Sequence, residues 1–180
     1  YNCLMTSKNC LTGTDRVAEV SKMIDADYYI NVQGDEPLFN PDDINILIES
    51  IYNTSNNYDV FSGYCDISQK TDFFSYSIPK LIFNQLEELL YMSRSPIPGN
   101  KTTEFNFGYR QVCAYAFSKS SLNLFGSNKI KTKFEKEEDI EILRFLELGI
   151  KVKMVKMSDN SISVDNKEDL VKVLNALNVQ

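Results

Sequence analysis

Two aspartates that lie far apart in the sequence could together hold a divalent cation. Asp35 follows the apolar segment 28–32, and Asp165 ends a second short apolar run just before the last predicted helix. Open α/β sheets bind ligands beyond the carboxyl ends of their strands, so both carboxylates could reach one crevice. A cation held there would neutralise triphosphate charge and orient an attack on phosphorus. Spacing alone leaves a structural alternative open, in which Asp35 stabilises a turn before Pro37 and Asp165 only precedes a helix.

The absence of histidine narrows the possible chemistry. The sequence contains none, which excludes a histidine-activated nucleophile and the usual zinc sites. The four cysteines are scattered without a paired metal-binding spacing, which indicates a reducing, cytoplasmic setting. Any metal must therefore be held by oxygen ligands, which points to Mg²⁺.

Two arginines stand in turns that could bind anionic parts of a ligand. Gly13 and Thr14 open the first predicted helix, where a small residue lets a ligand approach backbone N–H groups and Arg16 adds a positive charge. Arg94 follows a predicted strand in the segment 93–98, and its guanidinium could bind a carboxylate. In the alternative interpretation, Thr14 is only a helix N-cap, Arg16 is solvated and the segment 93–98 is a rigid turn.

Three further carboxylates are predicted on one face of a helix. Glu135, Glu138 and Glu141 recur every three residues within the expected helix 135–148. Most such runs form a solvated surface, although carboxylates that accept hydrogen bonds from hydroxyl groups are also typical of a sugar-binding surface. Both interpretations stay open at this stage.

The periodicity of apolar residues predicts the elements that would position these groups. We expect helices at about 14–24, from 40 onward, at 135–148 and from 166 onward, strands at 28–32, 58–64, 77–83, 89–92, 110–117 and 152–155, and a long loop at 95–105. Strands that alternate with helices predict an α/β fold with a mixed, mostly parallel sheet flanked by helices.

The composition limits the number of domains and the kinds of partner that the protein can bind. A chain of 180 residues with 43% hydrophobic residues fits one domain with one sizeable core. A net charge of −6 argues against nucleic acid as a partner, because phosphate backbones are bound by clustered Lys and Arg. No segment approaches the roughly 18 apolar residues of a membrane span, so no membrane partner is expected.

Four ordered segments resemble the motifs of one enzyme family, the CMP-Kdo synthetases (3-deoxy-manno-octulosonate cytidylyltransferases). The segment 31–38 reads NVQGDEPL and closely resembles the family's NVQGDEP signature; 5–7 with 13–19, 91–98, and 164–165 with 168–170 resemble its MTS…SGTDRxAE, YxSRxPIP and VDTPEDL segments. The resemblance covers essentially the whole chain. It favours the interpretation of Asp35 and Asp165 as a metal-binding pair.

The resemblance implies a fold, a reaction and a set of site residues. It implies a nucleotidyltransferase-like, Rossmann-type fold in a homodimer that uses CTP and Mg²⁺, releases pyrophosphate and activates a sugar acid such as Kdo for lipopolysaccharide or capsule synthesis. By position in the motifs, Mg²⁺ would be bound by the catalytic Asp35 and Asp165, CTP would be bound by Gly13, Thr14, Arg16 and Gln33, and the sugar acid would be bound by Arg94, Gln111, Tyr115 and Glu141.

Because of two departures from the family pattern, the sequence does not specify which sugar acid is the acceptor. The family has His-x-Gly-x-Tyr where this chain has the segment 111–115, and it has a glutamine where this chain has Ile142. Replacing a hydrogen-bonding glutamine by isoleucine removes a partner for a buried polar group, a loss on the order of 1–3 kcal/mol. The acceptor is therefore either Kdo or another keto sugar acid, such as a sialic- or amino-Kdo-like sugar.

The family's first strand and its Arg- and Lys-bearing phosphate loop lie upstream of the segment that matches residues 5–7. We therefore expect residues 1–180 to be the C-terminal part of a longer domain, with a projecting dimerisation segment at about 77–117. We also expect the 180-residue chain alone to be inactive and prone to aggregate, because a central strand would be left unpaired.

Two other classes of function make different demands on the sequence. A metal-dependent glycosyltransferase should show Asp-x-Asp at the end of a strand, whereas this chain reads Gly34-Asp35-Glu36-Pro37. A non-catalytic dimerisation or binding module would remain if the phosphate loop were lost.

Overall fold

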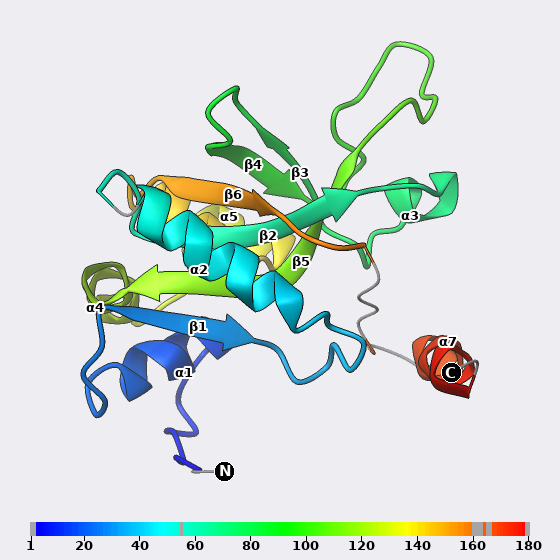
Figure 1. The fold of residues 1–180 in the computed structure, drawn as a ribbon. Coiled ribbons are helices and arrows are strands. Elements are labelled where there is room, and N and C mark those ends of the chain that lie inside the picture. Colours follow the sequence, from blue (N-terminus) through cyan, green and yellow to red (C-terminus); the bar gives the residue numbers. More distant parts are fainter. Residues whose placement is uncertain (1–2, 55, 160–163, 165–166, 179–180) are drawn as a thin grey trace.

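The computed structural model describes residues 3–54, 56–159, 164 and 167–178. It contains the strands β1 (Tyr28–Val32), β2 (Val60–Asp66), β3 (Lys80–Phe83), β4 (Leu89–Ser93), β5 (Tyr109–Ser118) and β6 (Val152–Lys156), and the helices α1 (Gly13–Val20), α2 (Asp42–Thr54), α3 (Lys70–Phe74), α4 (Lys119–Ser127), α5 (Lys133–Glu138), α6 (Ile142–Glu147) and α7 (Lys167–Asn178) (Figure 1). In the described part of the chain, no helix has the length and apolar character needed to span a membrane.

The six strands form one mixed sheet in the order β4-β3-β5-β2-β6, with β1 also paired to β5. The long strand β5 runs antiparallel to β2 along one edge, and β1 and β3 share its other edge. Because β1 and β2 are both antiparallel to β5, and β6 is parallel to β2, these three strands point the same way. The mixed α/β sheet is confirmed, but the expected dominance of parallel pairs needs correction, since β2–β6 is the one parallel pair among the described strands.

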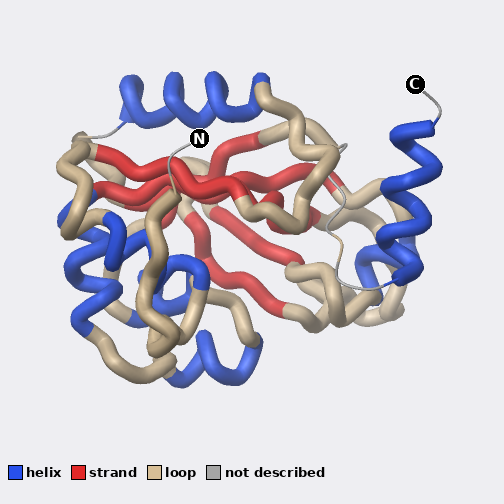
Figure 2. The backbone as a smooth tube through the Cα atoms, turned by 90° about the horizontal axis from the view of Figure 1, so that it is seen from below, coloured by secondary structure: helices blue, strands red, loops and turns tan. Residues whose placement is uncertain are grey.

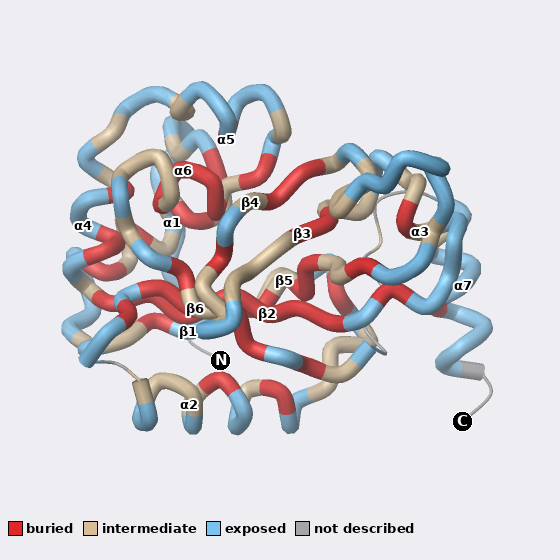
Figure 3. The backbone as a smooth tube through the Cα atoms, turned by 90° about the horizontal axis from the view of Figure 1, so that it is seen from above, coloured by how far each residue is buried: buried red, intermediate tan, exposed pale blue. Residues whose placement is uncertain are grey.

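Helices cover both faces of the sheet, and each face has its own apolar core. Helix α2 lies alone over one face, where Leu47 packs with Phe61 and Val112. Helices α1, α4, α5 and α6 lie on the opposite side (Figure 2), where Phe117 and Phe145 belong to the larger core cluster. Buried residues follow the strands and the inner sides of these helices (Figure 3), whereas α7 lies beyond the end of the sheet.

Most predicted elements are present within a few residues of their expected bounds. A hydrogen bond from Asn84 N to Glu88 O closes the turn between β3 and β4, and Asn40 Oδ1 accepts from Asp42 N at the start of α2. The loop predicted at 95–105 contains no helix or strand. Residue 166, where the last helix was expected to begin, lies outside the described residues.

The helix expected at 135–148 is divided into α5 and α6. Asp139 ends α5 in the left-handed region, with φ 52°, and a new helix begins at Ile142. A left-handed residue breaks the i to i−4 hydrogen bonds, so the two halves have different axes. The carboxylates at 135, 138 and 141 therefore do not share one helical face.

Candidate active site

An open cleft of about 480 Å³ lies where the N-terminus of α1 meets the C-terminal end of β1. Its lining brings together five of the predicted site residues from three separate segments: Gly13 and Arg16 from α1, Gln33 and Asp35 from the turn after β1, and Glu141 from the start of α6; Val17, Asn31, Val32 and Gly34 complete it. The cleft lies beyond the carboxyl end of a strand, where α/β sheets bind ligands.

Gly13 lies close to two of the polar side chains that line the cleft. A Cβ atom built on Gly13 would lie 3.5 Å from Glu141 Oε1 and 4.0 Å from Gln33 Nε2, which are ordinary van der Waals distances. The N–H of Gly13 donates to Glu141 Oε1 at 2.9 Å. A larger side chain would therefore occupy space beside the backbone that glycine leaves free.

Thr14 lies beneath the cleft and does not line it. Its side chain is buried, and Thr14 N and Oγ1 lie 2.8 and 2.5 Å from Glu141 Oε2. The N-cap of α1 is Thr12, whose Oγ1 accepts from Asp15 N at 3.1 Å, so the interpretation of Thr14 as the cap is wrong. Arg16 is exposed and donates to Thr6 Oγ1 at 2.8 Å.

Asp35 is exposed in the turn after β1, and Glu36 holds that turn against the sheet. The buried Glu36 accepts a hydrogen bond from Cys113 N with its Oε1 at 3.0 Å. The carbonyl of Asp35 accepts from Val164 N at 2.8 Å. Val164 directly precedes Asp165 in the sequence, but Asp165 itself lies outside the described residues. Among the described residues, no three His, Cys, Asp or Glu side chains form a metal-binding group.

Gln111 and Tyr115 contact each other inside the sheet rather than the cleft. Both are buried on β5, and Gln111 Nε2 donates to Tyr115 Oη at 3.1 Å. Burial raises the pKa of the Tyr115 hydroxyl well above its ordinary value, so it remains a hydrogen-bond donor at neutral pH. Ile142 is also buried, in the larger core cluster.

Arg94 is held by backbone carbonyls of two other segments. Its Nε donates to Glu138 O at 2.6 Å, its Nη1 to Tyr76 O and Ser77 O at 3.0 and 3.3 Å, and its Nη2 to Asp139 O at 3.1 Å. Arg94 does not line the cleft. The structure therefore gives it a role in joining the turn after β4 to the end of α5.

The three predicted carboxylates have different partners. Glu135 is fully buried and binds Arg144, Glu138 accepts from Ser93 Oγ and Arg94 N, and Glu141 binds the start of α1. The three carboxylates therefore form neither a shared solvated surface nor a shared sugar-binding surface, and both interpretations of this run are wrong. The interaction of Glu135 with Arg144 was missed, although a charged residue within the apolar run 142–146 was a signal for a buried ion pair.

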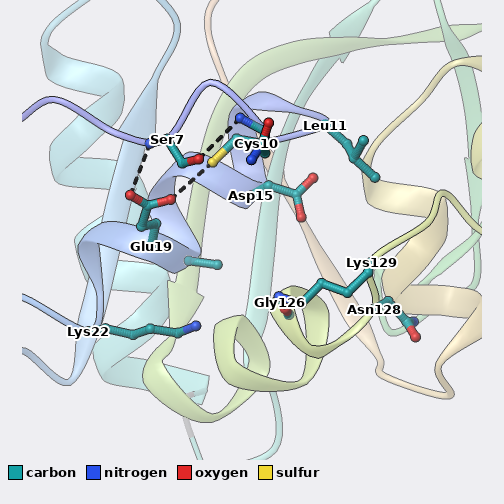
Figure 4. Close-up of a pocket in the computed structure, with 11 residues that line it drawn as sticks. Ser7, Cys10, Leu11, Asp15, Glu19, Lys22, Gly126, Asn128 and Lys129 are labelled. Atoms are coloured by element: carbon teal, nitrogen blue, oxygen red, sulfur yellow. Dashed lines mark hydrogen bonds between the residues drawn. The ribbon is translucent and has the colours of Figure 1, made fainter.

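A second pocket, of about 310 Å³, is drawn in Figure 4 and is lined by residues from the other face of α1. Glu19 accepts hydrogen bonds there from Ser7 N at 3.0 Å and from Cys10 Sγ at 3.3 Å. Asp15 of α1 and Lys22, which follows α1, also line this pocket, together with Gly126 at the end of α4 and Asn128 and Lys129 after it. Helix α1 thus separates the two pockets, with Gly13, Arg16 and Val17 on one side of it.

The chain is similar in sequence to enzymes that transfer cytidylyl groups. Residues 1–155 match the family model described as Cytidylyltransferase. The chain is 34% identical over 178 residues to the 3-deoxy-manno-octulosonate cytidylyltransferase of Protochlamydia amoebophila, covering 94% of this chain and 68% of that protein. It is 32% identical over 174 residues to the enzyme of the same name from Koribacter versatilis, covering 96% and 65%.

Solved structures agree with this similarity. A CMP:2-keto-3-deoxy-manno-octonic acid synthetase complexed with CTP superposes with a TM-score of 0.86 at 29% identity, covering 97% of this chain and 71% of that one. HddC from Yersinia pseudotuberculosis, complexed with GMP-PN, superposes with a TM-score of 0.67 at 16% identity, covering 96% and 65%, which shows a shared fold. The chain thus spans about two thirds of the length of the proteins it matches.

Proposed function

The chain belongs to the cytidylyltransferase family, a family of nucleotidyltransferase enzymes, and we propose that it transfers CMP from CTP to the anomeric hydroxyl of a 2-keto-3-deoxy sugar acid. Kdo is the first candidate acceptor, because the relatives are named for it. The observation that carries the proposal is the cleft itself. It collects Gly13, Arg16, Gln33, Asp35 and Glu141 from three distant segments, and these residues match the CTP, metal and sugar-acid positions of the family motifs.

CTP would occupy the side of the cleft formed by α1 and the turn after β1. Gly13 leaves space beside the backbone, while Arg16 and Gln33 supply a cation and a hydrogen-bonding amide. Thr14 would act from beneath, by holding Glu141. Since the amides of Gly13 and Thr14 already bind Glu141, the positive charge that this side of the cleft adds to the expected upstream phosphate loop would come from Arg16.

Asp35 and Asp165 would hold Mg²⁺. The exposed carboxylate of Asp35 at the cleft fits this ion, which prefers oxygen ligands, and the hydrogen bond from Val164 N to Asp35 O brings the sequence neighbour of Asp165 to the same turn. When bound, Mg²⁺ would offset the charge of the triphosphate and polarise its oxygens. The protein side chains would orient the acceptor hydroxyl toward the α-phosphorus, and positioning of this kind supplies much of the catalysis.

The sugar acid would bind near Glu141, with Arg94, Gln111 and Tyr115 as the remaining proposed contacts. Glu141 reaches the cleft directly. Gln111 and Tyr115 bind each other, and Arg94 binds carbonyl oxygens, so their contribution would be to shape the acceptor side. The buried Ile142 offers no hydrogen bond, which keeps keto sugar acids other than Kdo among the candidates.

Three further parts of the proposal concern the whole protein. We propose that residues 1–180 belong to a single nucleotidyltransferase domain, and that the protein forms a homodimer through a projecting segment at about 77–117. The exposed apolar side chains of Leu86, Leu90 and Phe107 on that segment support the second part. A reducing, cytoplasmic setting is supported by the four free cysteines.

Pyrophosphate release by the purified full-length protein, in which the expected phosphate-loop segment precedes residues 1–180, tests the proposal. The assay contains Mg²⁺, one of CTP or UTP, and one of a panel of keto sugar acids that includes Kdo. We expect release with CTP and Kdo and little release with UTP. Release with another acid only would keep the reaction and change the acceptor, whereas no release from folded protein with any acid would favour a non-catalytic binding module.

A further inference from the structure

Arg144 is a fully buried cation that joins α6 to the first turn of α1. Its Nη1 lies 2.9 Å from Asp15 Oδ1. Its Nη2 and Nε lie 2.6 and 2.7 Å from the two carboxylate oxygens of Glu135. The guanidinium carbon also lies 3.7 Å from the centre of the Phe125 ring. Arg144 therefore bridges two acidic residues that come from different helices.

Packing alone does not require a charge at this position. The neighbours Leu143 and Phe145 belong to the larger apolar core cluster. The desolvation of buried charges can exceed their mutual attraction, so an ion pair of this kind is weak evidence for a role in stability. The guanidinium instead contributes orientation, because its planar set of N–H donors holds both carboxylates in defined positions.

The segment 141–144 also holds the same turn at a second point. Glu141 accepts hydrogen bonds from Gly13 N at 2.9 Å and Thr14 N at 2.8 Å. Asp15 follows directly and is held by Arg144. Three consecutive residues at the start of α1 are thus tied to one turn of α6.

We propose that Arg144 is a positioning residue for the nucleotide side of the cleft: by fixing Asp15, it orients the turn that presents Gly13 and Arg16 to CTP. This inference rests on the proposed function, since it names CTP as the ligand. Asp15 lines the second pocket, not the cleft, so Arg144 acts through the turn without touching the ligand. The same contact explains why a buried charge is kept within an apolar core.

The test breaks the contact at its less buried end. Asp15→Asn keeps the size of the side chain, which is 12% exposed, and removes the charge that faces Arg144. The matched control is Asp59→Asn, which changes a carboxylate that binds Ser118 and Ser120 at the start of α4, beside the opposite end of β1. Two quantities are measured: the exchange of the Gly13 and Thr14 amides by NMR, and the affinity for CTP with Mg²⁺ by calorimetry.

We expect Asp15→Asn to speed exchange of the two amides and weaken CTP binding, each by about tenfold, because a charge-assisted contact is lost. Both quantities should stay within about twofold of wild type in Asp59→Asn. Arg144→Lys keeps the positive charge but loses the forked donor groups of the guanidinium. It should also speed exchange of the two amides and weaken CTP binding, and it tests the inference if Asp15→Asn does not fold.

A folded Asp15→Asn protein with wild-type exchange at Gly13 and Thr14 would overturn the inference. Wild-type CTP affinity in that variant would also overturn it, because the turn would then need no support from Arg144. If the wild-type protein binds no CTP, the proposed function fails on its own. In that case the exchange measurement still decides whether Arg144 holds the turn, since it requires no ligand.

Discussion

Glu141 Oε2 lies 2.5 Å from Thr14 Oγ1, so a carboxylate from a segment 127 residues away binds the start of α1. The same carboxylate accepts from the amides of Gly13 and Thr14. A negative charge at a helix N-terminus is favoured by the helix dipole and by the unpaired N–H groups of the first turn. The wall of the cleft is therefore held by a long-range contact.

We predict that Glu141→Gln lowers the free energy of unfolding by about 1–2 kcal/mol, because the charge-assisted hydrogen bonds to α1 become neutral ones. The measurement is urea denaturation followed by circular dichroism. Glu137→Gln is the control, since Glu137 is exposed on α5 and should change the stability by less than about 0.5 kcal/mol. Equal stability of the two variants would show that Glu141 does not support α1.

The buried Lys80 predicts how the stability of the protein depends on pH. Its buried ammonium donates to Ser75 O at 2.6 Å, to Ile78 O at 2.7 Å and to the carbonyl of Arg94. Burial, and then the charge of Arg94, lower the pKa of Lys80 from 10.5 to about 8. Between these two values the unfolded chain binds a proton that the folded protein lacks, so the contribution of Lys80 to stability rises with pH across this window.

To isolate this effect, the free energy of unfolding of wild type is compared with that of Lys80→Met at about pH 7, 8, 9 and 10. This range of roughly three pH units spans the lowered pKa of Lys80. The difference in unfolding free energy should be constant below about pH 8 and then shift in favour of wild type as pH rises. A difference that stays flat to pH 10 would mean that burial does not perturb this lysine.

The cysteines should differ widely in reactivity toward a thiol reagent. Burial raises the pKa of the Cys65 thiol to about 11, and its side chain is 1% exposed, whereas Cys3 is exposed. The thiolate is the reactive form, so we predict that Cys65 in folded protein at pH 8 reacts at least about 100-fold more slowly than Cys3. Cys3→Ser and Cys65→Ser variants assign the two phases. Comparable rates without denaturant would contradict the buried position of Cys65.

The sequence was sufficient to predict the local parts of the cleft. The strand 28–32, the turn that contains Asp35 and the helix that begins near Gly13 all follow from short-range patterns, namely apolar runs, glycine and proline. The motif resemblance then grouped Gly13, Arg16, Gln33, Asp35 and Glu141, and all five line the cleft. The metal pair itself stays a prediction, because Asp165 lies outside the described residues.

The long-range contacts could not be predicted from periodicity. The break at Asp139 depends on a left-handed residue inside a sequence with good helical periodicity, and nothing local requires it. Once the break is present, Glu135 of α5 binds Arg144 of α6 while Glu141 binds the start of α1, and residues 135 and 144 could not meet on one continuous helix. Arg94 was predicted to bind a ligand, but its position depends on carbonyls of two segments distant in the sequence.

The most direct test of the central claim compares Asp35→Asn with Asp27→Asn. The two aspartates lie at opposite ends of β1, both are exposed, and only Asp35 lines the cleft. The measurement is pyrophosphate release with CTP, Kdo and Mg²⁺ by the folded full-length protein. We predict that Asp35→Asn lowers turnover by about 100-fold or more, because the proposed metal-binding carboxylate would be lost, while Asp27→Asn stays within about twofold of wild type. Wild-type turnover by Asp35→Asn would contradict the assignment of this cleft as the site of CMP transfer.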